Sequence, residues 1–189
     1  MRSFIAIELP DHIGQCLTDL VSKLREPGDG VKWVRPENIH LTLRFLGEIE
    51  PTQANVLGEY LTKECAAIPP FRLKIRGVGA FPNLRRASVL WVGLESFGDE
   101  LATVQSISEM AAQSIGLPTE TRPFTPHLTL GRIRGSQPQA GTVDRLRDAS
   151  DFEGDDFLVQ TVALFRSELT PKGPVYTRLK ECSLKNVAL

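Results

Sequence analysis

The sequence has few of the residues that cross-link chains or bind transition metals. Only three of its 189 residues are cysteine and only three are histidine. Cys16, Cys65 and Cys182 are odd in number and scattered, and they lack the CxxC or Cys/His spacing of a disulfide framework or a zinc site. We therefore expect reduced, structural thiols and a protein that uses no metal and no other cofactor.

Long apolar runs and an excess of either charge are also missing. No stretch approaches the roughly 18 apolar residues of a membrane span, and the apolar part of segment 1–8 is too short for a signal peptide. We therefore expect a cytoplasmic protein with no membrane partner. Because the formal net charge is only −1, the whole molecule has no general attraction for nucleic acid, and any binding of phosphate must be local.

Against this background, the tetrapeptide His-Leu-Thr-Leu occurs twice, at 40–43 and 127–130, and it uses two of the three histidines. In a strand, the histidine and threonine of each copy share one face while the leucines share the other. Two such strands brought together would oppose two imidazoles across a cleft, each with a hydroxyl beside it. That layout suits general acid and general base catalysis near neutral pH.

The surrounding pattern predicts an α+β fold. Apolar residues at helical spacing predict helices at 11–25, 52–67, 98–115 and 142–147, the first capped by Asp11. Alternation and β-branched or aromatic runs predict strands at 4–7, 31–33, 40–46, 71–75, 87–94, 127–133, 157–167 and 175–182.

The two motifs divide the chain nearly evenly. His40 and His127 are 127 − 40 = 87 residues apart, and the order of helix, proline-bearing approach, motif strand and helix recurs in both halves. We expect one domain over residues 1–189, made of two related lobes of roughly half the chain each, with the chain crossing between them.

Four segments carry a family resemblance: RSFIAI at 2–7, VKWVRPENIHLTLRFLGE at 31–48, FTPHLTLGR at 124–132 and SELTPKGPVY at 167–176. With these flanks, the two motifs resemble the two-histidine phosphoesterase superfamily, and closely its bacterial and archaeal branch of RNA 2′,3′-cyclic phosphodiesterases, once called 2′-5′ RNA ligases. A single four-residue motif would be weak evidence. Two copies with extended matching flanks, in the right order, are strong.

The resemblance implies a bilobal α+β fold in which each lobe has an antiparallel sheet and outer helices, with a groove between the sheets that holds both motifs. It implies metal-independent hydrolysis of a terminal 2′,3′-cyclic phosphate on RNA to a 2′-phosphomonoester. By position, His40 would be the proton donor to the leaving oxygen and His127 the proton acceptor that activates water. The expected partners are RNA 3′ ends or small cyclic nucleotides, and no obligate protein partner is indicated.

The chemistry of this reaction fits the motif residues. A cyclic phosphodiester needs an activated water, a proton for the departing ribose oxygen, and hydrogen bonds to the other phosphoryl oxygens. Thr42 and Thr129 are placed to donate such bonds, and the resemblance adds Arg132 as a phosphate-binding residue. Strict alternation would turn Arg132 away from His127, so this role requires a twist or a bulge, which Gly131 could allow.

For several basic and aromatic residues the sequence allows two interpretations. The basic residues Arg44, Arg72, Lys74, Arg76, Arg85 and Arg86 could line the groove for an RNA backbone or form a solvated face. Trp33, Phe81 and Tyr176 could stack on a base or pack, whereas we expect Phe45, Trp91 and Phe165 in the core.

Rival functions follow from the same site. One is a phosphodiesterase or reversible ligase acting on 2′-5′-linked oligonucleotides or on a small cyclic nucleotide. Another is a catalytically silent module that binds RNA ends, although both histidines are retained. A metal hydrolase is a weaker rival, because two histidines on separate strands lack the acidic or thiol partners of a metal site. Because the repeats look alike, the motif itself does not say which histidine gives the proton.

Overall fold

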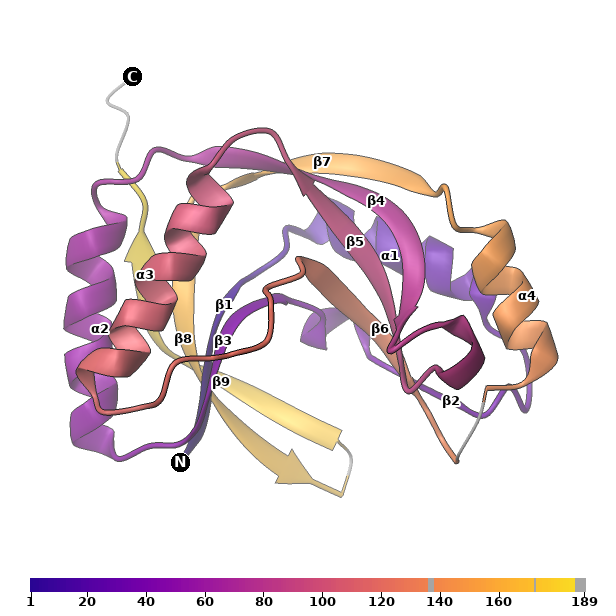
Figure 1. The fold of residues 1–189 in the computed structure, drawn as a ribbon, viewed down its shortest axis with the longest axis horizontal. Helices are drawn as coiled ribbons and strands as arrows, with labels where there is room; N and C mark the ends of the chain where they lie inside the picture. Colours follow the sequence, from indigo (N-terminus) through magenta and orange to yellow (C-terminus); the bar gives the residue numbers. More distant parts are fainter. Residues whose placement is uncertain (136–137, 172, 186–189) are drawn as a thin grey trace.

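The computed structural model describes residues 1–135, 138–171 and 173–185 (Figure 1). The strands are β1 (Arg2–Ile7), β2 (Val31–Trp33), β3 (Leu41–Glu48), β4 (Phe71–Phe81), β5 (Val89–Ser96), β6 (His127–Ile133), β7 (Glu153–Val159), β8 (Thr161–Thr170) and β9 (Gly173–Ser183). The helices are α1 (Asp11–Leu24), α2 (Pro51–Cys65), α3 (Glu100–Ser114) and α4 (Ala140–Asp148), with short 3₁₀ turns η1 (Pro36–Asn38) and η2 (Leu84–Arg86).

All strands join one curled antiparallel sheet in the order β7-β4-β5-β6-β3-β1-β8-β9, with β2 on β6. Its two halves meet between β3 and β6 at the single pair Leu41 and Leu128. We call β3-β1-β8-β9 the β1 half-sheet and β7-β4-β5-β6 with β2 the β5 half-sheet. Helices α2 and α3 cover the first, and α1 and α4 the second (Figure 1). The predicted α+β fold is confirmed, with the two sheets continuous through β3 and β6.

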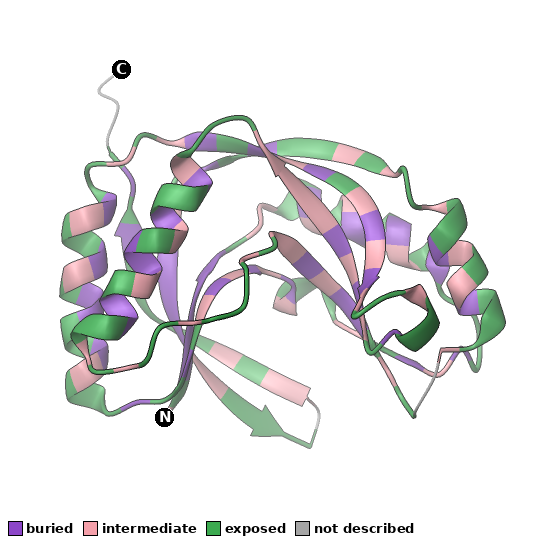
Figure 2. Cartoon of the chain, viewed as in Figure 1, coloured by how far each residue is buried: buried purple, intermediate pink, exposed green. Residues whose placement is uncertain are grey.

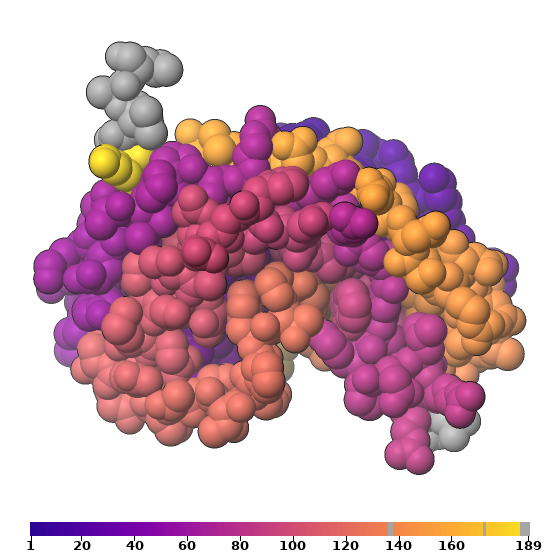
Figure 3. Space-filling view, turned by 45° about the horizontal axis from the view of Figure 1, so that its top comes forward, coloured from indigo at the N-terminus to yellow at the C-terminus, as the bar shows by residue number. Residues whose placement is uncertain are grey.

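The helices cover only one face of the sheet. In β1, Ile5 and Ile7 point into the main core under the helices, whereas Phe4 and Ala6 point to the opposite face and form a small separate cluster with Ala163 and Phe165. The buried stripes of the helices face the sheet (Figure 2). We call the helix-free side of the sheet the groove face. The space-filling view shows the surface hollowed between the chain near residue 120 and the chain near residue 85 (Figure 3).

The strand predicted at 157–167 is two strands. β7 pairs with β4 in the β5 half-sheet and β8 with β1 in the β1 half-sheet, so the chain crosses between halves at Gln160, whose carbonyl accepts a hydrogen bond from the Leu184 N–H at 2.8 Å. The apolar run around Gln160 has no glycine or proline to mark this exit. Each half-sheet therefore contains strands from both halves of the sequence. The prediction of a single domain over residues 1–189 stays a prediction.

Smaller differences lie at element ends. Asp11 is the first helical residue of α1, and Pro10 occupies the capping position assigned to Asp11. β4 continues to Phe81, well beyond the predicted end, because residues 78–81 pair with residues 89–92 of β5. Lys172 lies outside the described residues. No helix in the described part of the chain has the length and apolarity to cross a bilayer.

Candidate active site

The two motifs lie on neighbouring strands. Leu41 and Leu128 are the paired residues and are fully buried on the helix side. In an antiparallel pair, residues one step away on either side face each other on the opposite side of the sheet. The register therefore sets His40 across from Thr129, and Thr42 across from His127, on the groove face. The two imidazole-hydroxyl pairs thus lie side by side on neighbouring strands of one sheet.

Both imidazoles are oriented by the same kind of hydrogen bond, from Nδ1 to a backbone carbonyl oxygen. Nδ1 of His40 lies 3.0 Å from the Asn38 carbonyl oxygen, and Nδ1 of His127 lies 2.7 Å from that of Thr125. Since a carbonyl only accepts, each Nδ1 carries the hydrogen, and the nitrogen left free to accept a proton on each neutral ring is Nε2. Both side chains are thus oriented by the backbone two residues upstream, with Nε2 left to exchange a proton.

The two rings have different surroundings. His40 stacks on Phe4, with centroids 4.6 Å apart, and meets the edge of Tyr176 at 5.2 Å. This burial lowers the pKa of His40 to about 4, although its bond to Asn38 acts in the other direction, so the ring is neutral at pH 7 in the free protein. His127 contacts Phe81 edge-on at 4.9 Å, and its hydrogen bond is exposed to solvent.

A bulge follows the threonine in each motif. On β6, Trp91 pairs with Thr129 and Leu90 with Gly131, so Leu130 is the extra residue. A bulge reverses the alternation of the residues after it. Arg132 therefore returns to the groove face with Thr129, as its predicted role requires. Gly131 permits this arrangement, because a Cβ there would lie 2.6 Å from Cγ1 of Val31.

Another observation also places Arg132 near the site. Burial raises the pKa of Tyr176, and the positive charges of Arg132 and Arg2 partly offset this rise. Tyr176 touches the His40 ring. The charge of Arg132, on the β5 half-sheet, therefore acts on a residue of the β1 half-sheet beside His40.

The matching bulge in the first motif reveals a residue that the sequence prediction missed. On β3, Ala6 pairs with Thr42 and Ile5 with Arg44, so Leu43 is the extra residue. Phe45, five residues after its histidine as Arg132 is, pairs with Phe4 on the groove face and is 55% exposed. The prediction of Phe45 as a core residue is wrong. Its offset from His40, equal to that of Arg132 from His127, was the signal available in the sequence.

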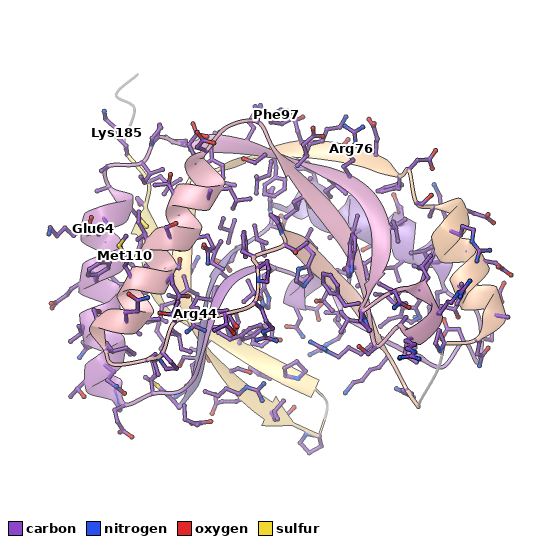
Figure 4. All side chains as sticks on the ribbon, in the orientation of Figure 1. Arg44, Glu64, Arg76, Phe97, Met110 and Lys185 are labelled. Atoms are coloured by element: carbon purple, nitrogen blue, oxygen red, sulfur yellow. The ribbon has the colours of Figure 1, made fainter. Side chains whose placement is uncertain are left out.

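The same bulge turns Arg44 toward the helices, so it does not line the groove. Its Nε lies 2.8 Å from Oε2 of Glu109 in α3, and its Nη2 donates to the Pro118 carbonyl oxygen. Figure 4 shows Arg44 beside α3, and Arg76 at the outer part of the other half-sheet.

Of the other basic candidates, three form ion pairs between neighbouring strands. Arg72 pairs with Asp156 at 2.7 Å, Lys74 with Glu153 at 2.7 Å, and Arg76 with Glu95 at 2.9 Å. Arg85 and Arg86 have no acidic partner within ion-pair distance among the described residues. Of the aromatic candidates, Phe81 and Tyr176 contact the histidines, whereas Trp33 packs against the core and donates to Asp29.

A cavity of about 660 Å³ adjoins His40. Its walls come from the start of α1, from η1 with the residues around it, and from the β8–β9 hairpin, including Gln15, Arg35, Asn38, Pro174 and Tyr176. This volume is in the range of small-molecule sites.

The thiols lie apart from this site. Cys16, Cys65 and Cys182 are free, and burial above all raises the pKa of Cys65 to about 12, so its reactive thiolate is disfavoured. Within the described residues, no group of three or more His, Cys, Asp or Glu side chains is gathered as a metal site.

Comparison with known proteins gives consistent results. A family model described as LigT like Phosphoesterase matches twice, at residues 7–91 and 92–176, so that each match holds one motif. An RNA 2′,3′-cyclic phosphodiesterase of Methanothermobacter thermautotrophicus is 31% identical over 95% of this chain and 97% of its own length. One from Aeropyrum pernix is 36% identical over 87% of this chain and 93% of its own.

Proteins of known structure share the fold of this chain. A protein of Thermus thermophilus superposes with a TM-score of 0.84 at 31% identity over 100% of both chains. E. coli LigT in complex with 3′-AMP gives a TM-score of 0.79 at 26% identity over 98% of each chain. With two family matches that span most of the sequence and a shared fold, the chain belongs to the LigT-like phosphoesterase family.

Proposed function

We propose that this protein hydrolyses the terminal 2′,3′-cyclic phosphate of RNA to a 2′-phosphomonoester, without a metal ion, by general acid and base catalysis. The observation that carries the proposal is the equivalent orientation of His40 and His127, each held by a backbone carbonyl so that Nε2 can exchange a proton. The activity named for the relatives supports the choice of substrate.

The surroundings of the two rings support the assignment of roles. His127, at the more exposed position, is the acceptor that takes a proton from the attacking water. His40, packed against Phe4 and Tyr176, is the donor to the leaving ribose oxygen. Because His40 is neutral in the free protein at pH 7, it must gain its proton when the substrate binds. A phosphate anion beside the ring favours the charged imidazolium and raises its pKa.

The remaining residues stabilise charge and orient the RNA end. Thr42 and Thr129 donate hydroxyl hydrogen bonds to the non-bridging phosphoryl oxygens, and the Arg132 guanidinium offsets their charge. Donors aimed at developing charge typically contribute about 10²–10³-fold in rate. Phe45, exposed on the same face, offers an aromatic ring on which the terminal base stacks.

The test is the hydrolysis of an oligoribonucleotide with a 2′,3′-cyclic end in the presence of EDTA, with identification of the product. The proposal predicts a 2′-phosphate at a rate that EDTA leaves unchanged. A 3′-phosphate product would contradict the regiochemistry, loss of activity with EDTA would contradict metal independence, and the absence of turnover would contradict the function.

The cavity beside His40 favours one second candidate, the cleavage or formation of 2′-5′ phosphodiester links. In that reaction the leaving group is a whole nucleoside, which needs space next to the proton donor, and the cavity provides it. Turnover of a 2′-5′-linked dinucleotide at a rate comparable with the cyclic-ended RNA would establish this candidate.

A further inference from the structure

Three separate segments of the chain are basic and contain no acidic residue. They are residues 31–35, 82–89 and 127–134. Together they hold six positive side chains, Lys32, Arg35, Arg85, Arg86, Arg132 and Arg134, and no Asp or Glu. In a protein of net charge −1, this is a strong local departure from the average.

The fold brings these segments to one end of the β5 half-sheet. Arg132 on β6 pairs with Lys32 on one side and with Val89 on the other. Residues paired directly across antiparallel strands share a face, so Lys32 lies with Arg132 on the groove face. The Ile133 N–H donates to the Ser88 carbonyl oxygen at 3.0 Å, which holds the β4–β5 turn, with Arg85 and Arg86, beside the end of β6.

This turn is fixed next to the site. Oδ1 of Asn83 accepts hydrogen bonds from the backbone N–H of both Arg85 and Arg86 at 3.1 Å. At the base of the turn, the Phe81 ring contacts His127. The two arginines therefore sit on a preformed support that begins at a catalytic histidine.

Their charges are not neutralised by the protein. Arg85, Arg86, Lys32 and Arg132 have no carboxylate within ion-pair distance in the part of the chain that the structure describes, whereas Arg72 and Arg76 on the outer part of this half-sheet are paired with Asp156 and Glu95. The fold thus neutralises the arginines of β4 and leaves those of the β4–β5 turn available to an external anion.

We infer that Lys32, Arg85 and Arg86 form a phosphate-binding track that holds the RNA chain upstream of its cyclic end, so that the substrate is an oligonucleotide in preference to a mononucleotide. This inference rests on the proposed function. Successive backbone phosphates supply the anions that these three side chains lack, and Arg132 joins the track to the reacting phosphate. Contacts of this kind give binding that weakens with salt.

The experiment compares two substrates and two charge-matched variants. The substrates are a pentaribonucleotide with a 2′,3′-cyclic phosphate and the cyclic mononucleotide of the same terminal base. The variants are Arg85→Gln/Arg86→Gln and the control Arg72→Gln/Arg76→Gln, each of which removes two positive charges. In the first variant we expect kcat/KM on the pentanucleotide to fall at least about tenfold, with mononucleotide turnover unchanged.

Salt dependence gives a second readout. The slope of log kcat/KM against log salt on the pentanucleotide decreases in magnitude by roughly 0.7 for each lost phosphate contact in the Arg85→Gln/Arg86→Gln variant, and it stays unchanged in the control. The phosphate-binding track would be contradicted if kcat/KM of the Arg85→Gln/Arg86→Gln variant fell equally on both substrates or did not fall. It would also be contradicted if the control variant showed the same fall. None of these results would contradict the hydrolase function. If the unaltered protein hydrolyses neither substrate, the proposed function and the track both fall.

Discussion

Arg44 of β3 and Glu109 of α3 form an ion pair at 2.8 Å, with side chains only 10% and 14% exposed. The same carboxyl group accepts a hydrogen bond from the Glu120 N–H at 2.9 Å, and Arg44 also donates to Pro118. The segment 115–126, which leads to His127, is therefore anchored to the strand of the other motif, two residues after Thr42.

Removing Arg44 leaves the largely buried Glu109 carboxylate without its cationic partner. We expect Arg44→Met to lower the free energy of unfolding by about 3–5 kcal/mol. The double variant Arg44→Met/Glu109→Leu recovers much of the loss, because neither charge remains. Urea unfolding measures the free energy of unfolding of the single and the double variant. Arg76→Met, at an exposed pair, is the control and should change stability little. Equal losses of unfolding free energy for Arg44→Met and Arg76→Met would show that the Arg44–Glu109 pair stabilises the fold no more than an exposed pair does.

Gly131→Ala tests the bulge that turns Arg132 toward the groove. Its Cβ would lie 2.6 Å from Cγ1 of Val31 and 3.3 Å from Cε3 of Trp33, so β2 or β6 must shift. We expect a loss of about 1–3 kcal/mol in unfolding free energy and a rise in KM, since Arg132 moves with the strand. The matched change Gly14→Ala lies in α1 with open space around it, and it should stabilise by roughly 0.5–1 kcal/mol. A Gly131→Ala protein with unaltered stability and KM would argue against this packing.

Desolvation of the partly buried His40 ring makes stability depend on pH. Its pKa of about 4 in the folded state lies below the ordinary value of 6.5, so the unfolded chain binds one more proton between those values. Stability is therefore fully present above about pH 6.5 and falls as the pH drops toward 4, by a total on the order of 3 kcal/mol. Denaturant unfolding of the unaltered protein and of His40→Gln, each at several pH values, isolates this contribution. The stability of the variant should be less sensitive to acid. If the stability of both proteins depended on pH in the same way, the pKa of His40 would not be lowered in the folded state.

The roles of the histidines are separable by the sign of a pH dependence. In His127→Ala the base is gone, and His40 is the remaining titrating group of the pair. If His40 donates a proton, the residual single-turnover rate falls as the pH rises, because the imidazolium is lost. A residual rate that falls as the pH is lowered would assign the base role to His40 and reverse the proposal.

Much of this site was predictable because its signal is local. The period of each motif orients His40 with Thr42 and His127 with Thr129, and this depends only on the strand itself. The helices were predicted for the same reason, since α1 buries Ile13, Leu17, Leu20 and Leu24 at helical spacing.

What the sequence could not predict depends on partners that are distant along the chain. The extra residues Leu43 and Leu130 are bulged only with respect to β1 and β5, so the final face of Phe45 could not be deduced from alternation. The break at Gln160 reflects two different partner strands, β4 and β1. Whether an arginine is paired also depends on strands far away in sequence, as for Arg72, whose partner Asp156 is 84 residues away.

The catalytic roles of His40 and His127 are tested by the rate at which three histidine variants hydrolyse a cyclic-ended oligoribonucleotide. His40→Ala and His127→Ala should each reduce the single-turnover rate by about 10²–10⁴-fold while keeping the unaltered protein's circular dichroism spectrum. His12→Ala is the matched control, because this third histidine lies in the first turn of α1 and, among the described residues, has only a long contact, 3.5 Å, with the Asp156 carbonyl oxygen. This control should keep full activity. Near-normal rates in either motif variant, with the fold intact, would contradict these catalytic roles.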